Sequence, residues 1–448
     1  MSTLIAFAAL FASIFLEQLG SGSLGPLDAL AGAARGFSER EIGLIGSGHY
    51  VGFLLGCYLA PRLIGRAGHA RVFAAAAAVG AIGALAHPLA VDPYAWAGLR
   101  ILTGVSIASA YTVVDAWLHA RTGNASRGRV FGIYRVVDMT GQVAAQGLIG
   151  VLDPASYAAY NVVAIFCCLC LLPLSLTNRT APTATHAPRL APIRAWRLSP
   201  TAMAGVVVAA ASSAAFRMVG PIYAEQGGLV PSEIALFLAA GLVGGVAAQI
   251  PVGWIADRVE RRRVLLGLSG VAAATCFWFA HGLGETPGAA LLIAGSFAFG
   301  LTAFPIYSVA ATYANDYAEP GFVIDLNASI VFYFSLGAIA APVLAAELIG
   351  ALGPGAMFDL LGLTHLSLIG FALYRATRRP GRRPVAPYRF WPRTSMVLAR
   401  LLRADATRPG AARSDTAPEG APGKAAPEGA GQETARVGDG GAQTRRPT

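Results

Sequence analysis

The stretch Gly253-Trp254-Ile255-Ala256-Asp257-Arg258, followed by Arg261-Arg262-Arg263, separates two long apolar runs near 233–255 and 264–283. A helix needs roughly 20 apolar residues to cross a bilayer core of about 30 Å. The two runs therefore predict two membrane helices joined by a short basic turn. Arginine in such a short loop is typical of the cytoplasmic side of a membrane protein.

Apolar runs of this kind fill most of the chain. Of its 448 residues, 55% are hydrophobic and 13% are charged, whereas soluble proteins carry about 25% charged residues. These figures exclude a soluble enzyme and predict an all-α integral membrane protein with twelve transmembrane helices. The twelve runs lie near 4–29, 42–60, 72–90, 95–118, 128–151, 157–177, 201–223, 233–255, 264–283, 288–313, 323–349 and 354–374.

The net charge of +10 is concentrated in the C-terminal tail. From Arg375 onward there are 15 Lys+Arg and 6 Asp+Glu, which leaves the rest of the chain with a net charge of +1. A basic segment beside the last membrane helix is typical of a cytoplasmic, lipid-facing flank, so we expect no nucleic-acid partner. With the N-terminus inside, the inside loops hold 14 Arg and the outside loops hold Arg35 and Arg40. Both termini are therefore expected in the cytoplasm. The inside loop near Asp316 and Glu319 has no Arg and breaks the pattern.

The chain repeats itself after about half its length. Gly36-Phe37-Ser38-Glu39-Arg40-Glu41-Ile42 matches Gly228-Leu229-Val230-Pro231-Ser232-Glu233-Ile234 at an offset of 192 residues. Further matches are Gly25-Pro26 with Gly220-Pro221, and Tyr111 and Gly141 with Tyr307 and Gly337 at an offset of 196. A duplication of six helices predicts two pseudo-symmetric bundles with a substrate site between them.

The repeat divides the chain into four parts. We predict a six-helix bundle at 1–177 and a second one at 201–374. The polar, Pro-rich segment 178–200 is expected to be a flexible cytoplasmic linker. Residues 375–448 form a basic cytoplasmic tail that we expect to be mostly disordered, with a candidate interfacial helix at 384–404.

The basic turn after the eighth run resembles the cytoplasmic signature of the major facilitator superfamily, which lies between spans two and three of each half. The resemblance implies a gating element made by Gly253, Asp257, Arg258 and Arg262. In the superfamily the carboxylate at the position of Asp257 pairs across the two halves and stabilises the outward-facing state. In the first half Pro61-Arg62 replaces the usual acidic-basic pair, which puts a latch there in doubt. The alternative is that these arginines only anchor the positive inside face.

Two further resemblances point to the same superfamily. Arg100 and Gly104 are similar to its span-four motif, in which a membrane arginine is linked to proton transfer. Asp115, Arg127-Gly128-Arg129 and the stretch around Tyr307 resemble the YcaD-like branch. The superfamily resemblance covers nearly the whole chain up to about residue 375.

Ionisable residues inside membrane spans are costly and usually functional. Glu17 lies in the middle of the first span, and Ser13 and Ser21 stand four residues to either side on one helix face. We expect this polar stripe to face a central cavity. The alternative is a buried, protonated Glu17 that bonds a backbone carbonyl.

Spans four, five and seven carry the other intramembrane charges. Asp115 and Arg135 fall at similar depth on neighbouring spans and are expected to form a charge pair. This pair would either take part in the function or be a permanent structural pair. Asp138 shares the face of Arg135. Arg217 needs a partner or an anionic ligand, or else it snorkels outward. Tyr111 and Tyr307 are candidates for the cavity wall, with packing or interface anchoring as the alternative.

The resemblance and the charges together predict a secondary active transporter of the inner or plasma membrane. It would act as a monomer and move a small solute by alternating access of its two halves. Protons are the expected coupling ion, with Glu17, Asp115 and Asp138 as candidate carriers. The five cysteines and seven histidines are scattered and indicate no metal or cofactor site. The alternatives are a membrane-embedded enzyme, for which H-E-x-x-H and G-x-S-x-G are missing, and a receptor or scaffold on a transporter fold.

Overall fold

The computed structural model describes residues 2–122, 124–176, 190–283, 287–319 and 321–378, and every regular element in these ranges is a helix. The predicted interfacial helix at 384–404 and the rest of the tail lie outside the described residues. Most of the predicted linker, at 177–189, lies outside them too.

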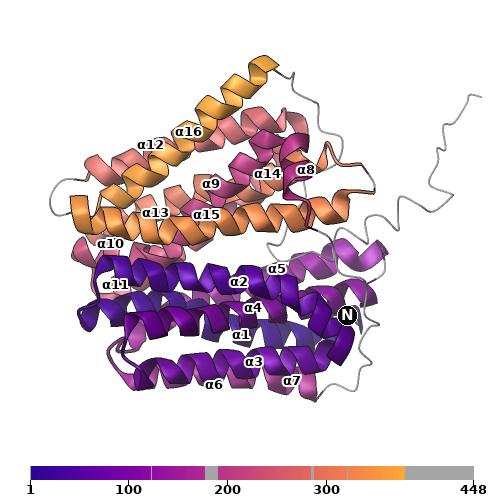
Figure 1. Ribbon diagram of the computed structural model, residues 1–448, viewed down its shortest axis with the longest axis vertical. Helices are drawn as coiled ribbons and strands as arrows, with labels where there is room; N and C mark the ends of the chain where they lie inside the picture. The colour runs from indigo at the N-terminus through magenta and orange to yellow at the C-terminus, as the bar shows by residue number, and fades with distance from the viewer. Residues whose placement is uncertain (1, 123, 177–189, 284–286, 320, 379–448) are drawn as a thin grey trace, which may run out of the picture. The chain divides into compact units, whose positions relative to one another are not determined.

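The first half provides seven α-helices and one short 3₁₀ helix (Figure 1). α6 and α7 follow one another as a single broken span. The elements are α1 (Ser2–Ala34), α2 (Glu39–Ala67), α3 (His69–Ala86), η1 (His87–Leu89), α4 (Pro93–Arg121), α5 (Asn124–Val151), α6 (Tyr157–Leu169) and α7 (Leu171–Ser175).

The second half repeats this order after the short helix α8. Two of its spans are broken, between α9 and α10 and between α13 and α14, and each second piece has proline in its first turn, where proline is well tolerated. The elements are α8 (Pro192–Leu198), α9 (Pro200–Met218), α10 (Gly220–Gln226), α11 (Pro231–Arg258), α12 (Arg261–His281), α13 (Ala289–Ala303), α14 (Pro305–Asn315), α15 (Val323–Leu352) and α16 (Ala356–Arg378).

Eleven helical segments of the described chain are long and apolar enough to cross a membrane. The remaining span of the predicted twelve is α5, which has 28 residues but carries Arg135 and Asp138 in its middle. Its lower apolarity therefore reflects charges that the protein encloses, as described below. The all-α membrane fold with two related bundles is confirmed.

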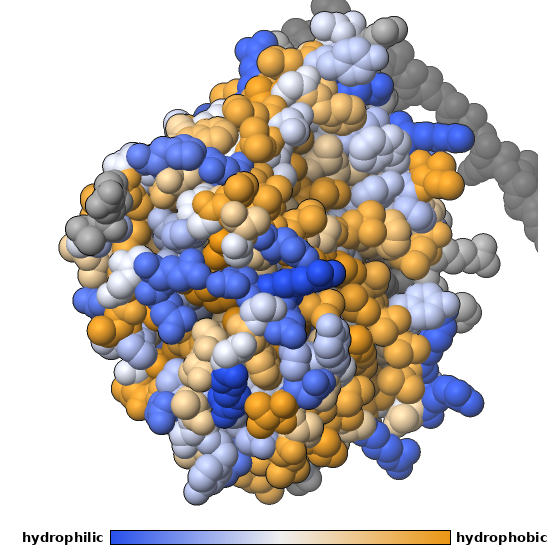
Figure 2. Space-filling model, turned by 60° about the vertical axis from the view of Figure 1, so that its left-hand side comes forward, coloured by the Kyte–Doolittle hydropathy of each residue, from blue (hydrophilic) through white to orange (hydrophobic). Residues whose placement is uncertain are grey.

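Each long span runs between two ends of the molecule, which we name by a glycine in the loop there. The Gly36 end holds the loop between α1 and α2, and the Gly68 end holds the loop between α2 and α3. Large apolar side chains such as Leu55, Ile82 and Ile250 are exposed on the helices between these ends. Such exposure suits a surface covered by lipid. Figure 2 shows hydrophilic residues gathered where the Gly36 end comes forward and hydrophobic residues on the adjoining helical surface.

The start of α2 and the start of α11 are built alike. Gly36 and Gly228 both have a positive φ, of 79° and 85°, a conformation that glycine adopts without steric cost. Glu41 accepts a hydrogen bond from the backbone N–H of Ser38, and Glu233 does the same for Val230. Both features repeat at the offset of 192 residues seen in the sequence.

The closest helix contacts also occur in equivalent pairs. A Cβ on Gly52 of α2 would lie 1.9 Å from the Ile101 carbonyl oxygen of α4, and one on Gly244 of α11 would lie 2.2 Å from the Phe297 oxygen of α13. Facing them, a Cβ on Gly104 or Gly300 would meet the backbone of the opposite helix at 2.1 or 1.9 Å. Small residues allow helix backbones to approach this closely in membranes. The two halves are therefore organised around the same pair of helices.

The two halves pack on each other along two seams. α2 lies against α15, and α5 lies against α11. Figure 1 shows α2 and α15 running side by side where the two halves meet. The space between these seams is lined by helices of both halves.

The described end of the predicted flexible linker is helical and held in place. Ala191 donates its backbone N–H to the Ser329 hydroxyl, and Tyr333 donates its hydroxyl to the Pro192 carbonyl oxygen. Trp196 of α8 stacks with Tyr333 and Phe371. The expectation of flexibility is therefore wrong for 191–198, because this segment carries an aromatic ring that packs onto the second half.

Alanine at Gly52 or Gly104 should destabilise the protein, because the added methyl group meets main-chain atoms that cannot rotate away. We expect a loss of about 1–3 kcal/mol, measured as a lower midpoint of thermal unfolding in detergent. Gly300→Ala should act similarly in the second half. Gly98→Ala is the matched control on α4, since a Cβ there meets nothing within 4 Å. Equal midpoints for Gly104→Ala and Gly98→Ala would contradict the packing argument.

Candidate functional site

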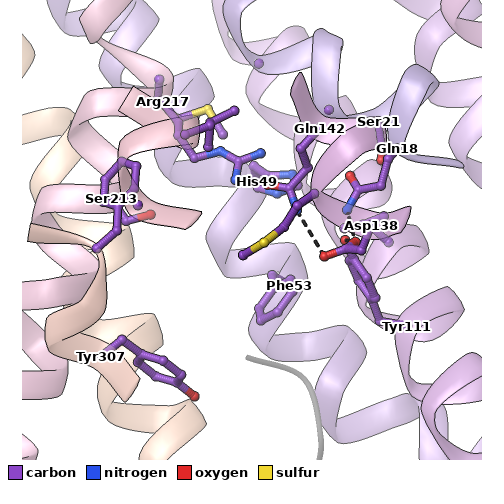
Figure 3. A pocket seen from close by; sticks show the side chains of 18 of the residues that line it. Gln18, Ser21, His49, Phe53, Tyr111, Asp138, Gln142, Ser213, Arg217 and Tyr307 are labelled. Atoms are coloured by element: carbon purple, nitrogen blue, oxygen red, sulfur yellow. Dashed lines mark hydrogen bonds between the residues drawn. The ribbon is translucent and has the colours of Figure 1, made fainter. Parts of the chain in front are cut away.

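A cavity of about 160 Å³ lies between the two halves. α1, α2, α4 and α5 line it from the first half, and α9, α11, α14 and α15 line it from the second. Figure 3 shows its labelled polar side chains pointing toward one another from both sides. Seven of the residues singled out in the sequence line it, namely Ser21, Arg100, Tyr111, Arg135, Asp138, Arg217 and Tyr307.

Asp138 of α5 is the centre of a hydrogen-bond network on the first-half wall. Its Oδ1 accepts bonds from Gln18 Nε2 at 2.5 Å and from the Tyr111 hydroxyl at 2.6 Å. Its Oδ2 accepts bonds from Arg135 Nη1 at 3.1 Å and from Gln142 Nε2 at 3.2 Å. The carboxylate is 1% exposed. Four donors around a buried carboxylate replace the hydration that it has lost.

Arg217 of α9 links the second half to this network. Its guanidinium reaches across the cavity in Figure 3 toward His49 and Gln142. Nη1 donates a hydrogen bond of 2.8 Å to Gln142 Oε1. Gln142 therefore joins Arg217 to Asp138, with its oxygen on the arginine and its amide nitrogen on the carboxylate. The sequence does not identify Gln18, His49 and Gln142 as cavity residues, because an amide or a neutral imidazole within a span carries no fixed charge that marks it.

A second buried charge pair lies nearer the Gly36 end. Arg100 of α4 is 1% exposed, and its Nε lies 3.3 Å from Asp28 Oδ2 of α1. Tyr160 donates its hydroxyl to Asp28 Oδ1 at 3.0 Å, and His87 Nε2 lies 3.5 Å from Oδ2. The sequence alone does not point to Asp28, because the expected first span, 4–29, places this residue at its very end. α1 in fact continues to Ala34, which places this carboxylate inside the helix.

Glu17 and Asp115 lie outside the cavity wall. Glu17 is 1% exposed and accepts a hydrogen bond from Cys170 Sγ at 3.2 Å, so it faces the sixth span. The expectation that the stripe of Ser13, Glu17 and Ser21 faces the cavity is wrong for Ser13 and Glu17. A step of four residues turns an α-helix by about 400°, so the stripe drifts around α1 and only Ser21 reaches the wall.

The expected pair of Asp115 with Arg135 is not the one observed. Arg135 forms its ion pair with Asp138, three residues on along the same helix and 3.1 Å away. Asp115 is fully buried on α4, away from the cavity wall. The similar depth of two residues on neighbouring spans did not reveal which faces of the helices they occupy.

The two halves are held together at the Gly36 end. Arg40 Nε lies 2.8 Å from Glu347 Oε1, and the Ser47 hydroxyl donates to the Ile339 carbonyl oxygen at 2.6 Å. Gly43 and Gly46 have room for no side chain, because Cβ atoms there would lie 2.6 and 2.8 Å from atoms of the second half. Tight contacts of this kind close the Gly36 end in this conformation.

The predicted gating element lies at the Gly68 end, within the second half. Asp257 lies 3.6 Å from Arg261 Nη2, one helical turn on. The Arg258 guanidinium lies over the Trp254 ring at 4.0 Å. Arg262 pairs with Glu260 at 2.9 Å, and Gly253 is buried in α11. These described contacts all lie within the second half.

Arg261, which was not among the predicted gating residues, is the buried member of this cluster. It is 1% exposed and pairs with Asp316 at the end of α14. Glu319, in the same loop, pairs with Arg194 of α8 at 3.0 Å. The inside loop without Arg therefore supplies carboxylates, and these pair with arginines from neighbouring segments.

Comparison with protein families matches the Major Facilitator Superfamily model at residues 10–229 and again at 201–409. The chain belongs to the major facilitator superfamily. The two matches cover the two halves and confirm the resemblance seen in the sequence. This protein is a membrane transporter and not an enzyme.

Two relatives of this transporter are similar along almost their whole length. An uncharacterized MFS-type transporter of Enterobacter sp. (strain 638) is 24% identical over 373 residues, which cover 83% of this chain and 96% of the relative. The uncharacterized MFS-type transporter YcaD of Salmonella newport (strain SL254) is 22% identical over 385 residues, which cover 84% and 97%. The second relative carries the name of the branch that the sequence resembles.

Solved structures share the fold at low sequence identity. The nucleoside transporter NupG superposes with a TM-score of 0.67 at 14% identity, covering 82% of this chain and 97% of that one. A D-xylose-proton symporter superposes with a TM-score of 0.62 at 14% identity, covering 88% and 99%. At this identity the similarity extends to the fold alone.

Asp28→Asn should destabilise the transporter strongly, because it leaves the Arg100 guanidinium buried without its counter-ion. Removing one partner of a buried pair costs about 3–5 kcal/mol, measured by thermal unfolding in detergent. Tyr160→Phe is the matched control, since it removes one hydrogen bond to the same carboxylate at a cost of about 1 kcal/mol. A smaller loss for Asp28→Asn than for Tyr160→Phe would show that the Arg100 charge needs no anion.

Proposed function

We propose that this protein is a proton-coupled secondary transporter that moves a small solute by alternating access of its two halves. The observation that carries the proposal is the charged cavity between the bundles, closed at the Gly36 end by Arg40–Glu347 and by helix packing. A carrier of this type rocks one bundle against the other around a central site. The bond between Arg217 and Gln142 crosses that site and has to break when the halves separate.

The proposal includes an orientation in the membrane. The arginines of the short loops lie mainly at the Gly68 end, which the positive-inside rule places in the cytoplasm. Both termini would then be cytoplasmic, in the inner membrane of a bacterial cell. With the Gly36 end facing outward, the closed contacts described above correspond to an inward-facing conformation of a monomer.

Asp138 is the residue we assign to proton coupling. It is the one carboxylate on the described cavity wall, and it is tied to the second half through Gln142 and Arg217. A proton on Asp138 would remove the negative charge that attracts Arg135 and the Gln142 amide. That change would weaken the hold of Gln142 on Arg217, so protonation and closure of the cavity are physically connected.

Alternating access predicts opposite distance changes at the two ends of the molecule. Spin labels at Ala34 and Ala351 report on the Gly36 end, and labels at Arg66 and Val259 report on the Gly68 end; all four residues are exposed. Pulsed electron resonance on protein in nanodiscs should show the first distance increasing as the second decreases when the pH is varied. The background chain carries Cys168→Ala, because the other four cysteines are buried. Distances that never change, or that change in the same direction, would contradict the proposal.

Asp138→Asn should abolish proton movement, because asparagine keeps the shape of the side chain but has no carboxyl group that takes up a proton. The loss of the Arg135 counter-ion should also lower stability, so only folded variant protein is reconstituted. The measurement uses proteoliposomes with a pH-sensitive dye inside and a panel of candidate solutes outside. A solute that drives proton flux with the wild-type protein should give the signal of empty liposomes with the variant. Asp153→Asn, in the loop before α6, is the matched control and should keep full flux. Undiminished flux in Asp138→Asn would remove this residue from the mechanism.

A further inference from the structure

The charges around the cavity do not balance. Arg100, Arg135 and Arg217 all line it. Arg100 is paired with Asp28 at 3.3 Å, and Arg135 is paired with Asp138 at 3.1 Å. Three guanidinium groups and two carboxylates leave one positive charge, and that charge belongs to Arg217.

Arg217 is neutralised by no carboxylate of the described chain. Among the described residues its hydrogen-bond acceptor is the amide oxygen of Gln142, a neutral group. A half-buried guanidinium with one neutral partner retains most of its five N–H donors for another acceptor. An uncompensated charge in a low-dielectric site favours the binding of an anion there.

Two other polar groups on the wall are also unsatisfied. His49 Nδ1 is buried and has no hydrogen-bond partner among the described residues, and the same is true of the Ser213 hydroxyl. Ser213 lies one helical turn before Arg217 on α9, and His49 faces Arg217 from α2 in Figure 3. An imidazole, a hydroxyl and a guanidinium around one space form a donor set that suits an oxyanion.

The rest of the second-half wall is mainly apolar. Leu242, Val246, Phe304 and Phe334 line it, together with the polar side chains of Gln249, Tyr307 and Ser308. Phe334 occupies the position that corresponds to Asp138 at the offset of 196 residues found in the repeat. The wall opposite the charge network therefore offers hydrophobic contact and, among the lining residues described, no second cation. This combination suits a ligand with one negative group and an apolar body.

We infer that the solute is a small organic monocarboxylate whose carboxylate binds Arg217 in place of the Gln142 amide oxygen. This inference rests on the proposed transport function and names the substrate class of its cavity. The planar guanidinium can hold a carboxylate through two parallel hydrogen bonds. Binding would release Gln142 from Arg217 and alter its contact with Asp138, so the solute and the proton would act on the same side chain.

The experiment measures thermal unfolding of the full-length protein in phosphatidylcholine nanodiscs, because a ligand that binds only the folded state raises its stability. The probes are acetate, benzoate and phenylacetate, each beside its neutral amide, with chloride and inorganic phosphate as inorganic anions. Benzoate and phenylacetate should raise the midpoint saturably, and should bind about tenfold or more tightly than acetate because of the apolar wall. Their amides, chloride and phosphate should have little effect. Equal effects of acid and amide, no effect of any carboxylate, or equal effects of the inorganic anions would overturn the inference.

Two variants locate the binding site. Arg217→Gln should weaken benzoate binding by about 30-fold or more, since one partner of a charge pair is lost. Ser213→Asp places a carboxylate one turn before Arg217, where it competes with the probe, and it should lose the response even if Arg217→Gln does not fold. Arg66→Gln, an exposed arginine at the Gly68 end, is the control and should respond as wild type does. A full benzoate response in Ser213→Asp would place the anion elsewhere and overturn the assignment.

This test is independent of the proposed transport function. If the carboxylates fail to bind while the spin-label distances still alternate, the substrate class is wrong and the carrier mechanism stands. If benzoate binds through Arg217 and the two ends never alternate, the anion site stands and the carrier mechanism is wrong.

Discussion

A charge in the middle of a membrane has to be enclosed by protein and balanced there, and this requirement shapes the whole molecule. Asp28, Arg100, Arg135 and Asp138 are all carried by helices of the first half, where Asp28 is buried and the other three line the cavity between the halves. Each is paired at hydrogen-bond or ion-pair distance with a side chain from the same half. The cost of leaving any of them unpaired is high in a low dielectric, so the first half has to keep its internal arrangement whatever the second half does.

Close helix packing helps the first half to keep the same internal arrangement of its helices. Gly52 and Gly104 bring the backbones of α2 and α4 into direct contact, and Gly244 and Gly300 do the same for α11 and α13. The bundles can therefore move as units while the contacts between them change. Among the described residues near the cavity, the bond from Arg217 to Gln142 links the Asp138 network to the opposite bundle, and Arg100 Nη2 lies 3.7 Å from Met218 Sδ of that bundle.

The fold could be predicted from the sequence because its determinants are long and repeated. Apolar runs of membrane-spanning length gave the spans, and matches at offsets of 192 and 196 residues gave the pseudo-symmetry. The sequence also predicted that Asp138, Arg217 and Tyr307 line the cavity, because charged and aromatic residues stand out within apolar spans. The hydrogen-bond and ion-pair partners of these residues could not be predicted, because pairing depends on how each helix is rotated about its axis. A drift of about 40° in four residues turns Glu17 away from the cavity, and a short step along α5 pairs Arg135 with Asp138.

The repeat keeps its closest-packed glycines, Gly52 and Gly104 with Gly244 and Gly300, and is unequal in its chemistry. Asp138 corresponds to Phe334, and Arg100 corresponds to Ser296, at the offset of 196 residues. The first half thus carries the carboxylate and two of the arginines on the cavity wall, and the second half carries Arg217 within a mainly apolar wall. Under the proposed mechanism, substitutions on the apolar wall of the second half would change which solutes fit the cavity and would leave the proton site at Asp138 intact. Diversification of cargo within such a lineage is therefore expected to accumulate in the C-terminal copy, while the N-terminal copy changes slowly.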